Sequence, residues 1–118
     1  MLFDVGNQIP AAANAIKVKF ASIATGMSTG TDALWTCQAA WMVDNQDSVT
    51  YGTAANVAVD LSPATLVYSA QTAAITPSGT RAAGCGLWLK FGRLPEVEGD
   101  DLEVVANLAW VEIEFVTV

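Results

Sequence analysis

The sequence predicts an all-β domain, a sandwich or a barrel, with little or no helix. Short runs of alternating apolar and polar residues recur along the chain, which is the pattern of half-buried strands. Turn residues, mainly Gly, Pro, Asn and Asp, separate these runs at spacings of about ten to fifteen residues, so that seven or eight strands fit into the chain. At 118 residues the chain suits one domain that buries roughly two-thirds of the surface of its unfolded form.

The predicted strands begin after an N-terminal arm. Residues 1–14 have no sustained period and contain Pro10, which predicts an arm or loop with at most a short helical turn. A single β domain over residues 15–118 follows. It opens with AIKVKFA, a half-buried strand with one apolar and one basic face, formed by Ile16, Val18 and Phe20 against Lys17 and Lys19.

The middle of the chain contains the next strand candidates. After the loop TGMSTGTD, residues 34–43 predict a long strand whose core face consists of Trp35, Cys37, Ala39, Trp41 and Val43. The run DNQDS predicts a turn, because Asn and Asp side chains bond to their own backbone there. The runs VTYGT and NVAVDL then predict two short strands or one broken strand.

Two further strands are predicted before the C-terminal region. Residues 65–76, TLVYSAQTAAIT, are rich in β-branched residues and end at the turn signal PSGTRAAG. The run CGLWLKF places Trp88 and Lys90 opposite an apolar face of Cys85, Leu87, Leu89 and Phe91. The loop GRLPEVEGDD follows.

The C-terminal segment GDDLEVVANLAWVEIEF allows a helical start, because Asp100 or Asp101 could cap a helix. Against a helix, Val104 and Val105 are β-branched, and the residues after Trp110 alternate between apolar and acidic. The apolar residues change from even to odd positions, which indicates a β-bulge or a sharp bend. We therefore expect a loop and short strand to about residue 107 and a final strand to residue 118.

Composition favours a protein whose faces are covered by neighbours. Only 14% of the residues are charged, against a typical value of about 25%. A surface of small uncharged residues suits assembly better than a free monomer. Twelve acidic and five basic residues give a net charge of −7 without a basic cluster, which argues against a nucleic-acid partner.

The N-terminus predicts neither export nor membrane insertion. No run approaches the roughly 18 consecutive apolar residues of a membrane span. The segment MLFDVGNQIP lacks the basic start of a secretory leader and contains Asp4, so we expect a protein made and kept in a cytoplasm. Cys37 and Cys85 lie in apolar runs, which favours two buried free thiols over the alternative of a disulfide between them.

Catalytic and metal-binding chemistry has few candidates. The chain contains no His, which excludes Ser–His and Cys–His nucleophile pairs and removes a principal zinc ligand. No glycine-rich phosphate loop is present, and we expect no enzyme activity and no cofactor. The acids between residues 96 and 103 are interpreted as a solvated loop. A Ca²⁺ site is the alternative there, although their spacing fits no calcium-loop pattern.

Two side chains, Arg93 and Trp88, are candidates for contacts. Arg93 is expected to pair with the acidic loop, within the chain or across a subunit contact. Trp35 and Trp41 share the predicted core face. Trp88 lies opposite the core face of its strand, which favours an anchor at an interface over a platform for a ligand.

Residues 87–115 resemble the closing region of jelly-roll virion proteins from tailed bacteriophages. In that group an apolar strand ends at an Arg, an acidic loop and a Leu-containing stretch of small residues follow, and the chain closes with a Val-x-Ile-x-aromatic strand. The matching elements here are Arg93, residues 96–101, residues 102–108, and Val111, Ile113 and Phe115. The upstream run TPSGTRAAG is similar to the hairpin that precedes the Arg strand. The chain departs from the pattern at Leu94, Pro95 and Trp110, and the resemblance covers about a third of it.

This resemblance implies a jelly-roll-like antiparallel β-sandwich of seven to eight strands with an extended N-terminal arm. It also implies a non-enzymatic virion protein, most like the capsid decoration (cement) proteins, which bind the outer capsid surface. Such a protein would be assembled in the host cytoplasm, form a homotrimer and bridge capsomers of the major capsid protein. The alternative is a receptor- or glycan-binding module of a tail or fibre. The expected subunit or capsid contacts are Leu2, Phe3, Ile9, Trp88 and Arg93.

Overall fold

The chain folds into two antiparallel β-sheets. The computed structural model describes residues 9–26, 30–43, 48–62, 65–82, 85–95 and 97–118, together with the backbone of Leu2–Asp4. One sheet has the order β1-β6-β3-β4, formed by β1 (Leu2–Asp4), β6 (Gly86–Arg93), β3 (Asp32–Met42) and β4 (Ala55–Asp60). The other has the order β5-β2-β7, formed by β5 (Val67–Tyr68), β2 (Ala15–Ala24) and β7 (Ala106–Val116). The described residues contain no helix, and the predicted all-β class is confirmed.

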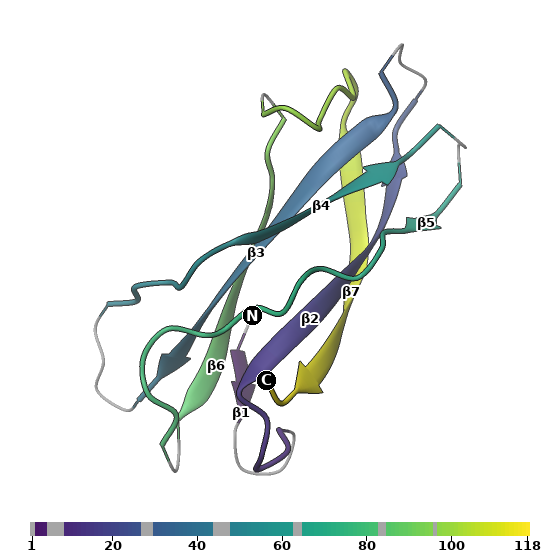
Figure 1. Ribbon diagram of the computed structural model, residues 1–118. Helices are drawn as coiled ribbons and strands as arrows, with labels where there is room; N and C mark the ends of the chain where they lie inside the picture. The colour runs from purple at the N-terminus through teal and green to yellow at the C-terminus, as the bar shows by residue number, and fades with distance from the viewer. Residues whose placement is uncertain are drawn as a thin grey trace.

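The two sheets form an elongated body of 48 × 25 × 21 Å, with the long strands β2, β3 and β7 running obliquely along it (Figure 1). Along the described strands the chain changes sheet at every connection except that between β3 and β4. Each sheet therefore contains strands that are distant in sequence. Within the described residues, no helix has the length and apolar character needed to cross a membrane.

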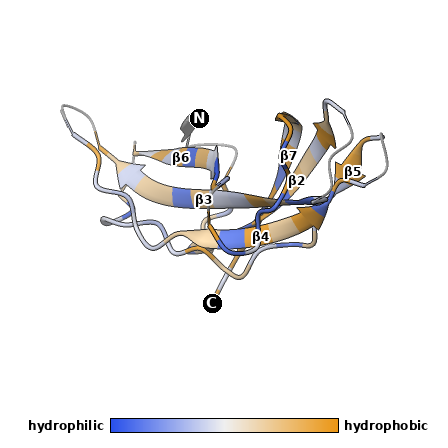
Figure 2. Cartoon of the chain, turned by 90° about the horizontal axis from the view of Figure 1, so that it is seen from above, coloured by the Kyte–Doolittle hydropathy of each residue, from blue (hydrophilic) through white to orange (hydrophobic). Residues whose placement is uncertain are grey.

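One hydrophobic core lies between the sheets. Phe20 of β2 stacks on Trp35 of β3 with ring centroids 5.8 Å apart, and it meets Phe91 of β6 edge-on at 6.0 Å. The buried indole N–H of Trp35 donates to Ser22 Oγ at 3.1 Å, which satisfies a polar group inside the core. Hydropathy changes from residue to residue along β3 and β6 (Figure 2).

The predicted core faces of three strands are confirmed. The residues concerned are almost fully buried: Ile16, Val18, Phe20, Trp35, Cys37, Ala39, Trp41, Cys85, Leu87 and Leu89. Val43, which the alternation also assigned to the core, is 47% exposed because it lies beyond the end of β3 at Met42. Alternation of side chains holds only while the backbone stays in the sheet.

The prediction of one long strand over residues 65–76 is wrong. Only Val67–Tyr68 forms a strand, yet the following residues still run beside β2 and bond to it. Backbone N–H groups of Ser69, Thr72 and Ile75 donate to the carbonyls of Phe20, Val18 and Ile16 at 2.8, 2.9 and 2.7 Å. In return, Phe20 N–H and Val18 N–H donate to side-chain hydroxyls, Ser69 Oγ at 2.9 Å and Thr72 Oγ1 at 3.1 Å.

These contacts explain why the strand pattern failed. The bonded residues are three apart on this segment but two apart on β2, so the segment cannot keep the period of a strand. Its Ser and Thr hydroxyls replace backbone carbonyls as acceptors, and both residues are buried. Hydroxyl side chains that bond to a backbone compete in this way with regular secondary structure.

The region of VTYGT also differs from the prediction. Residues 49–54 form no strand, and β4 begins at Ala55. The N–H groups of Gly52 and Ser78 both donate to the carbonyl of Ala39, each at 3.1 Å. A Cβ on Gly52 would lie 2.8 Å from the carbonyl oxygen of Thr76, so only glycine allows this close approach of the two segments.

The C-terminal segment contains the predicted change of phase. Ala21 of β2 pairs with Trp110, but the next residue, Ser22, pairs with Leu108, so that Ala109 is the extra residue of a β-bulge. Before the bulge Val104 and Ala106 pack against the core, and after it Val111, Ile113 and Phe115 do so. The final strand is confirmed as β7, Ala106–Val116, whereas the short strand expected before residue 107 is wrong, because residues 101–105 form no strand.

Part of the N-terminal segment lies on its own chain. The backbone of Leu2–Asp4 pairs with β6, with Leu2 opposite Trp88 and Phe3 opposite Leu87. Ile9 is 5% exposed and belongs to the core. Arg81 donates to the carbonyls of Ile9, Pro10 and Ala13, and its guanidinium carbon lies 5.4 Å from the centre of the Trp41 ring.

Candidate functional site

Arg93 forms an ion pair with Asp100 at the end of the body where β6 passes to β7. Nε and one terminal nitrogen of Arg93 donate to the two carboxylate oxygens at 2.8 and 2.7 Å, a bidentate geometry. Two further donations, to the carbonyls of Leu102 and Val104, bring to four the number of the five guanidinium N–H groups that bond within the chain. The side chain of Asp100 is 0% exposed and that of Arg93 is 16% exposed.

This pair fixes the loop before β7 to the start of β3. Asp100 Oδ2 also accepts the N–H of Leu34 at 2.8 Å, and Asp101 Oδ1 accepts the N–H of Asp32 at 2.8 Å. Arg93 and the N–H of Leu34 both favour the charged form, so the pKa of the Asp100 carboxyl lies below its usual range. The predicted pairing of Arg93 with the acidic loop is confirmed, within the chain.

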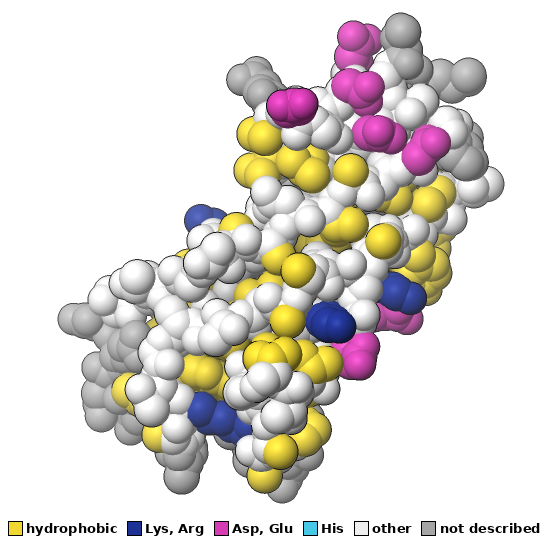
Figure 3. Space-filling model, viewed as in Figure 1, with side chains coloured by type: hydrophobic (Ala, Val, Ile, Leu, Met, Phe, Trp, Pro, Cys, Tyr) yellow, Lys and Arg dark blue, Asp and Glu magenta, His cyan; other side chains and the backbone are white. Residues whose placement is uncertain are grey.

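Acidic side chains gather at this end of the molecule (Figure 3). Asp32 begins β3 and Asp60 ends β4, while the loop before β7 contributes Glu98, Asp101 and Glu103. Among the described residues no group of three or more His, Cys, Asp or Glu side chains has the arrangement of a metal site. Glu96, which the alternative Ca²⁺ reading included, lies outside those residues.

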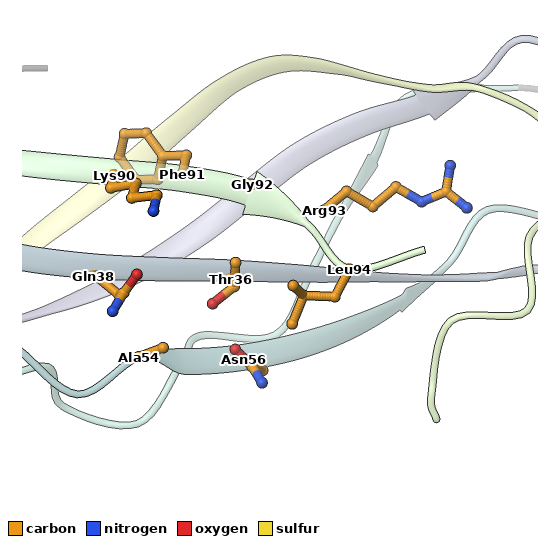
Figure 4. A pocket seen from close by; sticks show the side chains of 9 residues that line it. All are labelled: Thr36, Gln38, Ala54, Asn56, Lys90, Phe91, Gly92, Arg93 and Leu94. Atoms are coloured by element: carbon orange, nitrogen blue, oxygen red, sulfur yellow. The ribbon is translucent and has the colours of Figure 1, made fainter. Parts of the chain in front are cut away.

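A shallow groove crosses the outer face of the four-stranded sheet. It has a volume of about 350 Å³, at the low end of the roughly 300–1,000 Å³ typical of ligand sites. Figure 4 shows the residues that line it, which come from three neighbouring strands, the residue before β4 and the residue after β6: Thr36, Gln38, Ala54, Asn56, Lys90, Phe91, Gly92, Arg93 and Leu94. Thr36 pairs with Gly92 on one side and with Asn56 on the other, so one flank of the groove has no side chain.

Polar groups and one aromatic ring border this groove. Gln38 Nε2 donates to the carbonyl of Gly52 at 3.1 Å, which fixes the amide. Lys90 Nζ lies 5.8 Å from the centre of the Tyr51 ring, within cation–π range. The groove residues include no carboxylate. Trp88 is partly buried two residues from Lys90 on the same strand face, but it does not line the groove.

The outer face of the three-stranded sheet presents an aromatic pair, Tyr68 and Trp110. Both residues pair with Ala21 of the central strand, one from each side. Their rings meet edge-on with centroids 5.7 Å apart, while the side chains remain 47% and 45% exposed. Ala21 itself is 0% exposed, because the two rings cover it.

Several other exposed hydrophobic residues belong to the same sheet or to residues next to it. Most of the large exposed hydrophobics of the described chain belong to the three-stranded sheet or adjoin it: Leu66, Tyr68, Val105, Leu108, Trp110 and Val118. Glu112 and Glu114 continue the face beyond Trp110 and lie opposite Lys19 and Lys17. We call Tyr68, Trp110, Glu112 and Glu114 together the aromatic–acidic face.

Comparisons with known proteins give no relative. No family model, no curated protein and no solved structure matches the chain. Function therefore has to be argued from the surfaces described above.

The structure places the predicted contact residues in different surroundings. Ile9 is in the core, and the guanidinium of Arg93 is engaged within its own chain. Leu2 and Phe3 form the edge strand β1, beside the partly buried Trp88. A role of these five residues at a subunit or capsid contact stays a prediction.

The sequence reasoning did not single out the aromatic–acidic face. A signal was present, because Trp110 shares its even numbering with Glu112 and Glu114 and therefore lies on their side of the strand. Tyr68 had no such signal, since the segment that contains it does not keep the period of a strand.

The two cysteines are buried free thiols, as predicted. Cys37 is 0% exposed and Cys85 is 1% exposed. Burial raises the pKa of the Cys37 thiol to about 12, so its reactive thiolate form is scarce at neutral pH.

Proposed function

We propose that the protein is a non-enzymatic structural protein of a tailed-phage virion that decorates the outer capsid. The observation that supports this function best is the aromatic pair of Tyr68 and Trp110, two large rings left nearly half exposed on a regular sheet. Exposed aromatic residues beside other apolar side chains are typical of surfaces that bind another protein. The jelly-roll connectivity of seven to eight strands in a β-sandwich belongs to the same proposal.

Decoration would stabilise the head by mass action. A protein that binds only the assembled shell lowers the free energy of that state, and contacts to two neighbouring capsomers of the major capsid protein act together. The weakly charged surface and the exposed apolar residues suit such a covered position. Self-association, as a homotrimer, would multiply these contacts on the outer capsid surface.

The second contact in this proposal is the N-terminal segment before Ile9, because Ile9 itself lies in the core. The short pairing of Leu2–Asp4 with β6 involves three residues of each strand, so that a neighbouring surface could compete for it. Deletion of residues 1–8 is expected to weaken binding to particles while the two sheets stay folded. Full retention on particles would remove the arm from the proposal.

The test uses particles and purified protein. Mass spectrometry of purified virions is expected to find the chain in many copies, and particles stripped of it are expected to rebind added protein saturably. Trp110→Ala should rebind at least tenfold more weakly. Tyr51→Ala, which changes an aromatic residue beside the other sheet and outside the predicted contacts, is the control. Absence of the chain from virions, or equal rebinding by Trp110→Ala, would contradict the proposal.

A second candidate function is glycan recognition by a tail or fibre module, and the groove of the four-stranded sheet favours it. The groove combines amides, a hydroxyl, a lysine and a nearby tyrosine, which are groups that bind sugar hydroxyls and rings. A glycan array would test it. Saturable binding that Asn56→Ala or Lys90→Ala abolishes would favour recognition over decoration.

A further inference from the structure

We propose that the free edge of β7 accepts a basic, extended segment of a partner protein as an additional strand. This inference deepens the proposed function, on which the choice of a protein partner rests, by naming the chemistry of the partner segment. It depends on three properties of β7: its place at the sheet edge, the direction of its backbone groups and the charges on its outer face.

β7 lies at the edge of its sheet, where it pairs only with β2 among the described strands. On β2, the backbone groups of Ile16, Val18 and Phe20 bond to the segment of residues 69–75 on the far side. Because backbone groups alternate in direction along an antiparallel strand, those of the residues between them point towards β7. Lys17, Lys19 and Ala21 therefore bond to Glu114, Glu112 and Trp110.

The same alternation directs the backbone of Val111 and Ile113 away from β2. Each of these residues presents one N–H and one C=O at the edge, and no described residue bonds to them there. Such a row of donors and acceptors is a template for another strand. The side chains of Val111 and Ile113 meanwhile pack against the core, so the edge is held in place.

Charge decides which strand the edge can accept. Glu112 and Glu114 project from the outer face on either side of Ile113. In a symmetric pairing of two copies through this edge, glutamates of one copy would lie opposite or diagonal to glutamates of the other. Like charges at these positions destabilise a sheet, so the occupant is not a second β7.

The pairing of β7 with β2 shows which side chains a partner strand on the free edge needs. β2 places Lys19 opposite Glu112 and Lys17 opposite Glu114 on the outer face, and apolar side chains towards the core. A strand on the free side meets the same two glutamates and the same apolar edge of the core. The fitting segment therefore alternates apolar residues with Lys or Arg over at least five residues, and it binds by addition to the sheet.

Trp110 extends the site at one end. It lies on the same outer face, two residues before Glu112, and is 45% exposed. A partner strand that pairs with Val111 and Ile113 brings its own neighbouring residues next to this ring. Strand addition and burial of the aromatic pair would then act in a single interface.

The test measures peptide binding to the full chain by NMR and fluorescence anisotropy. The probes are a nine-residue peptide with alternating Val and Lys, the same peptide with Glu in place of Lys, and a version of the basic peptide interrupted by Pro. We expect saturable binding of the first peptide alone, with at least tenfold slower hydrogen exchange of the Val111 and Ile113 amides. The Glu112 amide, which already bonds to β2, is the internal reference.

A matched pair of variants separates the edge from the acidic end of the molecule. Glu112→Gln combined with Glu114→Gln should weaken binding of the basic peptide about tenfold. Glu98→Gln combined with Glu103→Gln removes the same charge from the loop before β7 and should leave the affinity within about twofold. Both variants change exposed side chains, so both should remain folded.

Three outcomes would overturn the inference: equal binding of the basic and interrupted peptides, protection confined to the acidic end, or no loss with Glu112→Gln and Glu114→Gln. If the peptide does not bind but Trp110→Ala still prevents rebinding to particles, strand addition is wrong and the proposed function stands. If the peptide binds and the chain is absent from virions, the proposed function is wrong and the edge site stands.

Discussion

The acidic residues before β7 and those within β7 differ in where their carboxylates lie. Asp100 points inward, pairs with Arg93 and is fully buried. Glu112 and Glu114 point outward from an edge strand, beside an exposed tryptophan. Glu112 and Glu114 lie 12 and 14 residues after Asp100, and residues 104–111 between them contain no acidic side chain.

This difference separates a structural from a binding role. A buried carboxylate with a bidentate arginine and a backbone N–H has no capacity left for a partner. Glu114 already accepts a bond from Gln71 Nε2 at 2.5 Å, but both glutamates remain exposed beside the edge of β7, where a partner can reach them. Burial gives Asp100 a structural role, while exposure at the strand edge supports the proposed binding role of the glutamates.

Substitution of the buried Asp100 is expected to lower the stability of the protein most. Asp100→Ala leaves the Arg93 guanidinium and the Leu34 N–H without their partner in a buried site. We expect the free energy of unfolding to fall by about 3–5 kcal/mol, the usual cost of breaking a buried pair on one side. Urea denaturation followed by tryptophan fluorescence measures it.

A double-mutant cycle sharpens this prediction. Arg93→Met should destabilise the protein by a similar amount, and the double variant should lose clearly less than the sum of the two, since neither residue is then left alone. Additive losses would mean that the two side chains do not act as a pair.

The same pair predicts a pH dependence. The pKa of Asp100 is lower in the folded than in the unfolded protein, chiefly because Arg93 bonds to its charged form. Its contribution to stability is therefore present above the ordinary carboxyl pKa of about 4, and it is lost as the pH falls through the lowered folded value.

Denaturation of the wild type and Asp100→Asn between pH 7 and pH 2 measures this contribution. The difference in stability between the two proteins should shrink as the pH falls below about 4. Asp60→Asn is the comparison. The pKa of Asp60 is also lowered, by the Ser62 N–H, but at an exposed site, so the stability difference between this variant and the wild type should change less with pH. A difference for Asp100→Asn that does not change with pH would contradict the assignment.

An intermediate effect is expected at the aromatic pair. Trp110→Ala removes the edge-on contact with Tyr68 and uncovers Ala21. The loss of stability should be about 1 kcal/mol, the range of an aromatic pair that is partly solvated. A loss as large as that of Asp100→Ala would mean that Trp110 serves mainly the fold.

Substitution of the exposed Glu112 and Glu114 is expected to change the stability least. Glu112→Gln with Glu114→Gln removes two cross-strand partners of Lys17 and Lys19, each worth about 0.2–1 kcal/mol. Thermal unfolding should therefore shift by a few degrees at most. If this variant does not fold, Glu112 and Glu114 are needed for stability, as Asp100 is.

The sequence predicted the parts of the fold that follow one local rule. Ile16, Val18 and Phe20 alternate with lysines and are buried, as expected. The change from even to odd positions before Val111 predicted the bulge that the structure places at Ala109. Both signals depend only on the period of side chains along a strand.

The parts that failed depend on contacts between distant segments. Ser69 and Thr72 lie beside β2 through their hydroxyls, and no local pattern distinguishes such residues from those of a strand. The hydrogen bond from the Leu34 N–H to Asp100 likewise joins residues far apart in the chain. One part of the aromatic–acidic face could be predicted, because Trp110, Glu112 and Glu114 occupy alternate positions and so share one face of the strand. Tyr68 could not, because it meets Trp110 only across β2.

The most direct test of the proposed function and of strand addition at β7 is a cryo-EM structure of the particle that contains this protein. We expect the aromatic–acidic face and the β7 edge to contact the major capsid protein, with Trp110 buried and a basic strand beside Val111 and Ile113. A structure in which β7 faces solvent while another surface of the chain makes the contacts would contradict it.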